Sequence, residues 1–369
     1  MERHATWTEL FFDLVFVVAV AQLASGLHSR LSVAGALAFA GLFVPVWWTW
    51  TTYAYVADLF DADDGPFRAV LLGSMLLVAA LAATIPAAFD GRTGGFVIAY
   101  AVLRADLVAV YVWAWRSDRP LRSLVGPHIV GFSLGGIVWL SSLALAAPER
   151  YVAWGVAIAI DLATGLVAYL SGSDVPRHRS HMPERFGLFA LIVLGESVIA
   201  VSLGTARSSW AVASVATAGL GFALAAVLWW MYFARFDESV FDWALAGGAS
   251  ERRRSFVFGY GHLLVLAALA AVGVGVRVAI EQAIGGGPAT HAAPLLGLAV
   301  AVYLAALSMI QRAAPRGLPG SALAGRVALA AALAVLATLG HDLGALVFVA
   351  VATIAVLAQT VVEGFVLEP

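Results

Sequence analysis

The chain contains no cysteine and no lysine, and it carries few charged residues of any kind. The lack of cysteine excludes disulfides, thiolate metal sites and iron–sulfur clusters. Because all 21 basic residues are arginine, a Schiff-base lysine is excluded as well. Charged residues make up 12% of the chain and hydrophobic residues 62%, against about 25% and about 45–50% in soluble domains. The composition therefore excludes a soluble globular protein.

Long hydrophobic runs are what the sequence has in abundance. A transmembrane helix needs about 20 mostly apolar residues, and we find about 12 such runs with short connections between them. They predict an all-α polytopic membrane protein with no room for a separate soluble domain. The formal net charge of −2 gives no basic field, so no nucleic-acid partner is expected. The predicted spans are residues 8–27, 32–54, 67–89, 96–115, 124–146, 151–170, 186–205, 212–233, 256–280, 294–310, 322–339 and 343–362.

Arginines are unevenly distributed between the two sides that these spans define. Fifteen of the 21 fall on one side and four on the other, while Arg104 and Arg277 lie within spans. Because cytoplasmic loops carry the excess of arginine, we predict that both termini are cytoplasmic. The first run opens with Glu9 and Asp13 in place of a basic segment, so we interpret it as the first span and not as a signal peptide.

The two halves of the sequence resemble each other in the order of their landmarks. These are Glu9 and Glu184, Trp47-Trp48 and Trp229-Trp230, and Arg68 and Arg254. The pattern predicts two parallel six-helix repeats, residues 1–175 and 176–369, within a single integral membrane unit. Parallel repeats are common in transporters, with the substrate site between the halves, but membrane enzymes and scaffolds also arise by duplication.

Glu196 is the first candidate for a functional residue. It follows Glu184 by 12 residues, which is about 18 Å along a helix, so it is expected near the middle of the bilayer. Gly195 would permit close backbone approach, and Ser197 adds a hydroxyl beside the acid. Glu196 could bind a proton or a cation, or act as a general acid or base. The alternative is an acid paired with a buried arginine to fix helix packing.

A second acidic group opens the first span. Glu9 and Asp13 are four residues apart and share a helix face, and Gln22 extends nearly the same stripe. Two like charges there need a cation, a shared proton or water. The alternative is helix capping, which explains Glu9 better than Asp13.

Arg104 and Asp106 lie in one apolar run and point to different faces of their helix, so each needs a partner elsewhere. Arg104 could pair with Glu196, Asp13 or Asp161, or with an anionic ligand. A structural ion pair is the preferred interpretation.

Another pair, Arg277 and Glu281, is four residues apart and could form on its own helix. Gly131 and Gly135 form a Gly-x-x-x-Gly helix-packing pattern, which indicates close packing.

The histidines give little support for a metal or a cofactor, and neither is predicted. His178, His181 and Glu184 have the spacing of a metal triad, but neighbouring arginines would repel a cation. His128 and His262 could titrate in a proton path or hold haem, although hydrogen-bonded core histidines are the commoner case.

Two segments are similar to the hallmark motifs of the bacterial low temperature requirement protein A (LtrA) family. One is Trp7-Thr-Glu-Leu-Phe-Phe-Asp-Leu-Val-Phe-Val17 with Gln22-Leu23, and the other is Glu184-Arg-Phe-Gly-Leu-Phe189 with Val193-Leu-Gly-Glu-Ser-Val-Ile-Ala200. The resemblance implies a multi-pass protein of the bacterial inner membrane, linked by the family's name to growth in the cold. It implies no settled activity. The family's motif residues correspond to Glu9, Asp13, Glu184, Arg185 and Glu196.

The favoured function is a secondary transporter or proton-coupled permease for an unidentified solute, with Glu196, Asp13, Gln22 and Arg104 around a cavity between the halves. A membrane-embedded enzyme acting on a lipid or isoprenoid-type substrate is the first alternative, although an enzyme is the less expected outcome. A structural or sensory membrane protein is the second. Membrane lipids, protons and a small solute are the expected partners, and the sequence leaves the oligomeric state open.

Overall fold

The computed structural model of the chain describes residues 6–59, 65–117, 119, 121–171, 181–207, 210–237, 239–241, 243 and 247–367, which form helices joined by short connections. These residues form no β-strand, and a single isolated bridge joins Pro288 and Gly344. The α-helices are α1 (Trp7–Ser29), α2 (Val33–Leu59), α3 (Gly65–Phe89), α4 (Gly94–Ser117), α5 (Arg122–Ser141), α6 (Glu149–Ser171), α7 (His181–Arg207), α8 (Val212–Phe233), α10 (Ala249–Gln282), α11 (Ala292–Ala313), α12 (Gly320–Leu339) and α13 (Ala345–Leu367). Short 3-10 turns follow α5, α10 and α12: η1 (Ser142–Ala144), η2 (Ile284–Gly286) and η3 (Gly340–Asp342).

Twelve helices in the described residues are long and apolar enough to cross a membrane, which confirms the all-α polytopic prediction. Helices satisfy their backbone hydrogen bonds internally, and this is what a chain crossing hydrocarbon requires. The main departure from the prediction is α10, which begins at Ala249 and not at 256. Its polar start is stabilised where the Gly248 N–H donates to the Glu251 carboxylate at 2.8 Å, so a charged segment expected in a loop extends the helix.

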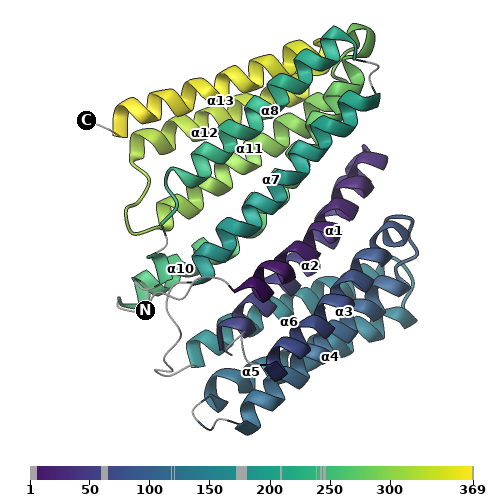
Figure 1. Cartoon of the computed structure of the whole chain (residues 1–369), viewed down its shortest axis with the longest axis vertical. Coiled ribbons are helices and arrows are strands. Elements are labelled where there is room, and N and C mark those ends of the chain that lie inside the picture. Colours follow the sequence, from purple (N-terminus) through teal and green to yellow (C-terminus); the bar gives the residue numbers. More distant parts are fainter. Residues whose placement is uncertain are drawn as a thin grey trace. The chain divides into compact units, whose positions relative to one another are not determined.

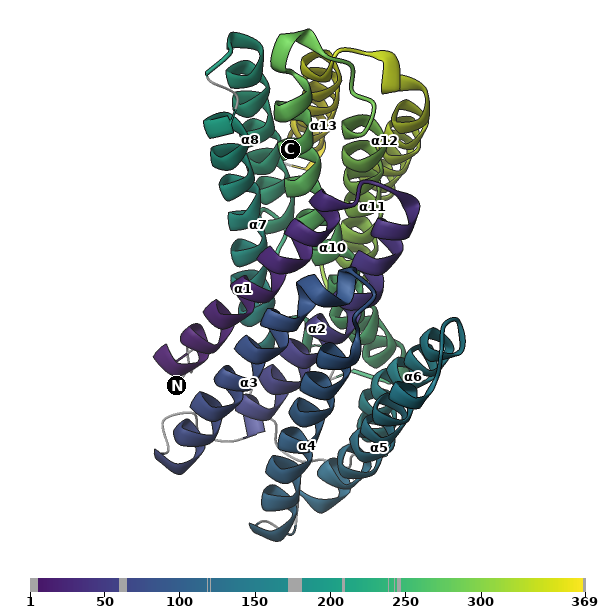
Figure 2. The ribbon, with the colours of Figure 1, turned by 90° about the vertical axis from the view of Figure 1, so that its right-hand side faces the viewer.

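The helices group into two compact units, each described here by itself. The N-terminal unit comprises Arg3–Gly26 and Leu37–His178. The C-terminal unit comprises Arg179–Pro369 together with Met1–Glu2 and Leu27–Ala36. In the N-terminal unit α3 packs on α4, α4 on α5 and α5 on α6, and the α5–α6 hairpin can be followed in Figure 2. The internal repeat stays a prediction.

The C-terminal unit is organised around α10. This helix packs against α7, α8, α11 and α13, while α11 also contacts α12 and α13 also contacts α8 (Figure 1). The apolar window of α10 is 72% buried and that of α12 only 22%. Outer helices leave large apolar side chains exposed, such as Leu339 at 72% and Ile354 at 61%. This is the pattern expected where lipid and not water surrounds the helices.

Candidate functional site

The most unusual buried group of the N-terminal unit is the Arg104 guanidinium. Arg104 is the eleventh residue of the 24-residue α4 and is 1% exposed. It therefore lies about 15 Å from the start of the helix, near the middle of the span. Its Nη2 donates to Thr49 Oγ1 at 2.9 Å and, more weakly, to Thr52 Oγ1 at 3.5 Å, both on α2.

The remaining surroundings of the Arg104 charge are aromatic. The guanidinium carbon lies 4.7 Å from the ring centre of Tyr100 and 5.1 Å from that of Phe132. Among the described residues, no acceptor reaches its Nε or Nη1 atoms and it forms no ion pair. The expected pairing with Asp13 or Asp161 is therefore not formed. The predicted pairing with Glu196, which belongs to the other unit, stays a prediction.

Asp161 of α6 is the carboxylate on which the Arg104 charge acts, without contact between the two groups. Asp161 is fully buried and its Oδ2 accepts a hydrogen bond from the Tyr100 hydroxyl at 2.6 Å. The indole N–H of Trp139 lies close to this carboxylate but outside hydrogen-bonding geometry, and Asp161 Oδ1 has no donor in the described part of the chain. Arg104 and Asp161 are thus a buried guanidinium and a buried carboxyl group that do not pair, each with unused hydrogen-bonding capacity.

Glycines of α5 make room for the polar residues of α6, which confirms the predicted close packing. A Cβ placed on Gly131 would overlap the Thr164 side chain, and one placed on Gly135 would lie 2.5 Å from Asp161 Oδ1. Gly126, on the same helix, would meet nothing within 4 Å.

These glycines provide a matched test of the packing around Asp161. We expect Gly135→Ala to lower the free energy of unfolding by about 1–3 kcal/mol, because the added methyl group displaces a buried carboxylate. Gly126→Ala should be neutral or stabilising by up to about 1 kcal/mol, because alanine is the better helix former. The measurement is the folded fraction of purified protein during denaturant titration. Equal effects of the two substitutions would contradict this packing.

Two further acids within the helices of the N-terminal unit accept hydrogen bonds from neutral donors. Asp106 accepts hydrogen bonds from the Tyr53 hydroxyl at 2.5 Å and the Ser74 hydroxyl at 2.7 Å. The side chains of Asp106 and Arg104 thus reach different partners, as their spacing predicted. The buried Asp13 carboxylate accepts the indole N–H of Trp50 at 2.8 Å.

Glu9 caps the start of α1, which was the alternative interpretation of this residue. Its carboxylate accepts the Thr6 N–H at 2.7 Å, and the Thr6 hydroxyl accepts the Glu9 N–H at 3.3 Å. This reciprocal pair is a capping box, which satisfies backbone donors that a helix start leaves free. Gln22 is partly exposed and makes no hydrogen bond with the described residues.

Glu196 of α7 lies in the C-terminal unit and is partly exposed, although its Oε2 atom is buried without a donor among the described residues. Arg277 of α10 is the charge that acts on it. Arg277 Nε also donates to Glu281 at 3.1 Å, which confirms the predicted pair, and Glu281 contacts His28 Nε2 at 2.9 Å. Arg277 therefore carries a charge shared between two acids.

The close approach predicted at Gly195 is wrong, because a Cβ there would meet nothing within 4 Å. The tight contact lies one residue further on. Ser197 is buried, and its Oγ would be 3.1 Å from a Cβ on Gly273 of α10. The glycine that allows α7 and α10 to approach thus belongs to α10, where no motif distinguished it.

Arg185 is buried and Glu184 partly exposed at the start of α7. His178 of the proposed metal triad lies outside the described residues, within which no cluster of metal-binding side chains occurs. His262 is fully buried, with its Nδ1 on the Phe258 carbonyl at 2.7 Å and its Nε2 on the Tyr232 hydroxyl at 2.9 Å. Both ring nitrogens are therefore engaged, as in a core histidine.

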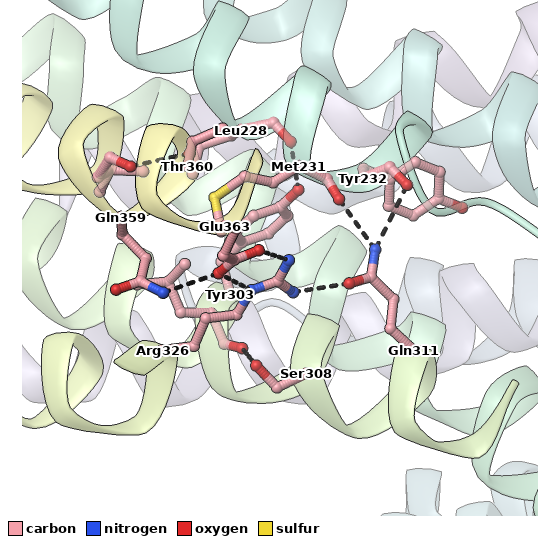
Figure 3. Close-up of polar contacts among 12 residues, drawn as sticks. Leu228, Met231, Tyr232, Tyr303, Ser308, Gln311, Arg326, Gln359, Thr360 and Glu363 are labelled. Carbon is pink, nitrogen blue, oxygen red and sulfur yellow. Dashed lines mark hydrogen bonds and ion pairs between the residues drawn. The ribbon is translucent and has the colours of Figure 1, made fainter. Parts of the chain in front are cut away.

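A buried polar centre in the C-terminal unit was missed by the sequence argument. Arg326 of α12 is 1% exposed and donates through Nε and Nη2 to the two carboxylate oxygens of Glu363 on α13, at 2.7 and 2.6 Å. Its Nη1 donates to Gln311 of α11 at 2.7 Å, and the Gln359 amide donates to Glu363 at 2.9 Å (Figure 3). Gln311 in turn donates to the Met231 carbonyl of α8 at 2.9 Å. The network joins four helices.

Comparison with known proteins gives the family. The sequence pattern of the bacterial low temperature requirement A protein (LtrA) family matches residues 4–358. The chain belongs to the LtrA family. A relative in Rhizobium meliloti (strain 1021), named as an uncharacterized protein, is 28% identical over 337 residues, which cover 87% of this chain and 80% of the relative. No solved structure matches the chain.

The LtrA motif residues lie in both units. Glu9 and Asp13 belong to the N-terminal unit, and Glu184, Arg185 and Glu196 belong to the C-terminal unit. Family membership and the twelve candidate spans together make this LtrA protein an integral, multi-pass membrane protein. The predicted cavity that Glu196 shares with Asp13, Gln22 and Arg104 stays a prediction.

Proposed function

We propose that this LtrA protein is a secondary transporter, most simply a proton-coupled permease, for a small solute not yet identified. The observation that carries the proposal is the Arg104 guanidinium, buried in mid-span without an ion pair among the described residues. A charged side chain at the bilayer centre costs about 2.5–3.5 kcal/mol on insertion scales. Leaving buried donors unsatisfied adds to this cost.

If residue 104 served only to pack helices, an apolar side chain there would avoid that cost. The neighbours Tyr100 and Phe132 would pack as well against an apolar side chain, and the charge of Arg104 joins no ion-pair network among the described residues. A guanidinium with free donors is suited to an anionic group that arrives and leaves. The anionic group of a solute, or its hydration water, is the partner that the proposal assigns to Arg104.

Carboxylates in the spans supply the means of coupling to protons. In the described part of the chain, Asp161 and Asp106 accept hydrogen bonds from hydroxyl groups and form no ion pair, so each can exchange a proton without breaking one. Glu196 is partly exposed and shares the charge of Arg277 with Glu281. Intramembrane acids of this kind commonly form proton relays in transporters.

The arginine distribution supports the placement proposed for the protein. We place it in the bacterial inner membrane with both termini in the cytoplasm, since most of the arginines fall on the side that carries the termini. Transport of a solute needed at low temperature would account for the family's name.

Solute-dependent proton flux in reconstituted liposomes tests the proposal. Wild-type protein should acidify or alkalinise the lumen when one member of a solute panel is added to one side. Glu196→Gln should reduce that rate by about tenfold or more, because the amide cannot exchange a proton. Glu149→Gln removes an exposed acid at the start of α6 and is the matched control. Wild-type flux equal to that of protein-free liposomes for every solute would reject transport.

A further inference from the structure

A cavity of about 330 Å³ lies in the C-terminal unit, next to the network of Figure 3. Its walls come from the end of α8, the segments that follow α8 and α11, and parts of α12 and α13. The charged residues among its lining are Arg235, Asp237, Arg316, Arg326 and Glu363. The volume is at the lower end of the range of about 300–1,000 Å³ typical of ligand pockets, so it suits a small polar group.

The charges in the lining do not cancel. The bidentate pair with Glu363 neutralises Arg326. Arg235 and Arg316 form no ion pair or hydrogen bond with the described residues, and Asp237 is the second acid of the described lining. Among the lining residues that the structure describes, three arginines stand against two carboxylates, so positive charge is in excess. An anionic ligand would offset this excess.

Asp237 places a second requirement on the ligand. Its side chain is buried, with an exposed fraction of 6%, and its Oδ1 accepts hydrogen bonds from the Ser239 N–H at 3.0 Å and hydroxyl at 2.6 Å. Its Oδ2 is buried and has no donor among the described residues. A carboxylate oxygen left in this state calls for a hydrogen-bond donor on the ligand.

Arg235 lies just beyond the end of α8, outside the span. Burial, and then repulsion by Arg326, lowers the pKa of Arg235, and the attraction of Glu363 only partly opposes this. The positive potential at Arg235 is thus not fully compensated by the protein. A bound anion would compensate it.

We propose that this cavity binds an organic anion that combines a phosphate ester or carboxylate, held by Arg235 and Arg316, with a hydroxyl group that donates to Asp237. The site is separate from Arg104 and does not depend on the transport proposal. Two sources offer this chemistry: the phosphoglycerol headgroup of an anionic lipid and a free phosphorylated polyol. The neighbouring Trp230 is 58% exposed on the outer face of α8. Tryptophan at that level and basic pockets between helices are both typical of headgroup contacts.

Binding to purified protein in neutral detergent tests the site. The probes are short-chain phosphatidylglycerol, short-chain phosphatidylcholine and glycerol 3-phosphate, and the readouts are calorimetry and the thermal midpoint. We expect saturable binding of phosphatidylglycerol, glycerol 3-phosphate or both, and none of phosphatidylcholine, which lacks a net charge and a headgroup donor. Arg235→Gln and Arg316→Gln should each weaken binding about tenfold or more, because each removes a charge-assisted hydrogen bond.

Arg253→Gln is the matched control, because it removes an exposed arginine of α10 that does not line the cavity. It should leave the affinity unchanged. Selective binding of the lipid assigns a headgroup, and selective binding of glycerol 3-phosphate assigns a soluble ligand. Absence of binding by both anions, or equal weakening by Arg253→Gln, would overturn the proposal. Arg316 is exposed, so its variant preserves the test even if Arg235→Gln does not fold.

Discussion

Glu363→Leu is expected to lower the free energy of unfolding by about 3–5 kcal/mol, among the largest effects of any single substitution in the chain. The substitution leaves the Arg326 guanidinium buried beside an apolar group, with Gln311 as its remaining partner. An unpaired buried charge loses both its hydration and its counter-charge. The measurement is unfolding of purified protein in mixed micelles, followed by helical circular dichroism and by retention of the monodisperse peak after heating.

The double variant Arg326→Met with Glu363→Leu is the control. It removes both charges and keeps the volume of the side chains, so most of the lost stability should return. The difference between the single and double variants isolates the cost of the unpaired charge from the cost of changed packing. A Glu363→Leu variant that unfolds like the wild type would show that the ion pair of Figure 3 does not hold α12 against α13.

Arg104→Met should have the opposite combination of effects, with little change in stability and a large loss of transport. Removal of the charge relieves the cost of burying it, which offsets the loss of the aromatic contacts, so the free energy of unfolding should change by less than about 1 kcal/mol. Solute-dependent flux should fall by about tenfold or more, because the anion loses a charge-assisted partner. Thermal unfolding and liposome flux are measured on the same preparation.

Two further variants distinguish this role of Arg104 from a structural one. Arg326→Met breaks an ion pair and should destabilise the fold strongly, whereas Arg104→Met should not, although both arginines are equally buried. Arg104→Lys keeps the charge but loses the planar fork of donors, so it should retain only part of the flux. Destabilisation of Arg104→Met by as much as Arg326→Met would show that Arg104 has a structural partner.

The membrane-spanning helices could be predicted from the sequence because hydrocarbon, and not water, surrounds them. Hydrocarbon requires internally satisfied backbones and apolar surfaces, and both requirements are visible as runs of about 20 apolar residues. The start of α10 was missed for a related reason. The charged residues before 256 carry no hydropathy signal, and the Glu251 contact that stabilises them depends on local geometry.

For the polar residues, the sequence predicted only those features that depend on spacing along one helix. The spacing of Arg104 and Asp106 separated their faces, and the Thr6–Glu9 pair follows a capping pattern. The partners came from tertiary packing, as with Trp50 on Asp13. Arg326 was counted with the loop arginines and Glu363 lay beyond the last predicted span, so nothing in the sequence suggested that these two residues, 37 positions apart, form a buried pair.

The most direct test of the account is solute-driven proton flux in liposomes that contain equal amounts of folded wild type or Arg104→Met. We expect flux with the wild type for at least one anionic solute. With Arg104→Met the rate should fall by about tenfold or more, while the two proteins unfold at similar temperatures. Equal flux with both proteins would contradict the assignment of the buried Arg104 charge to the transported solute.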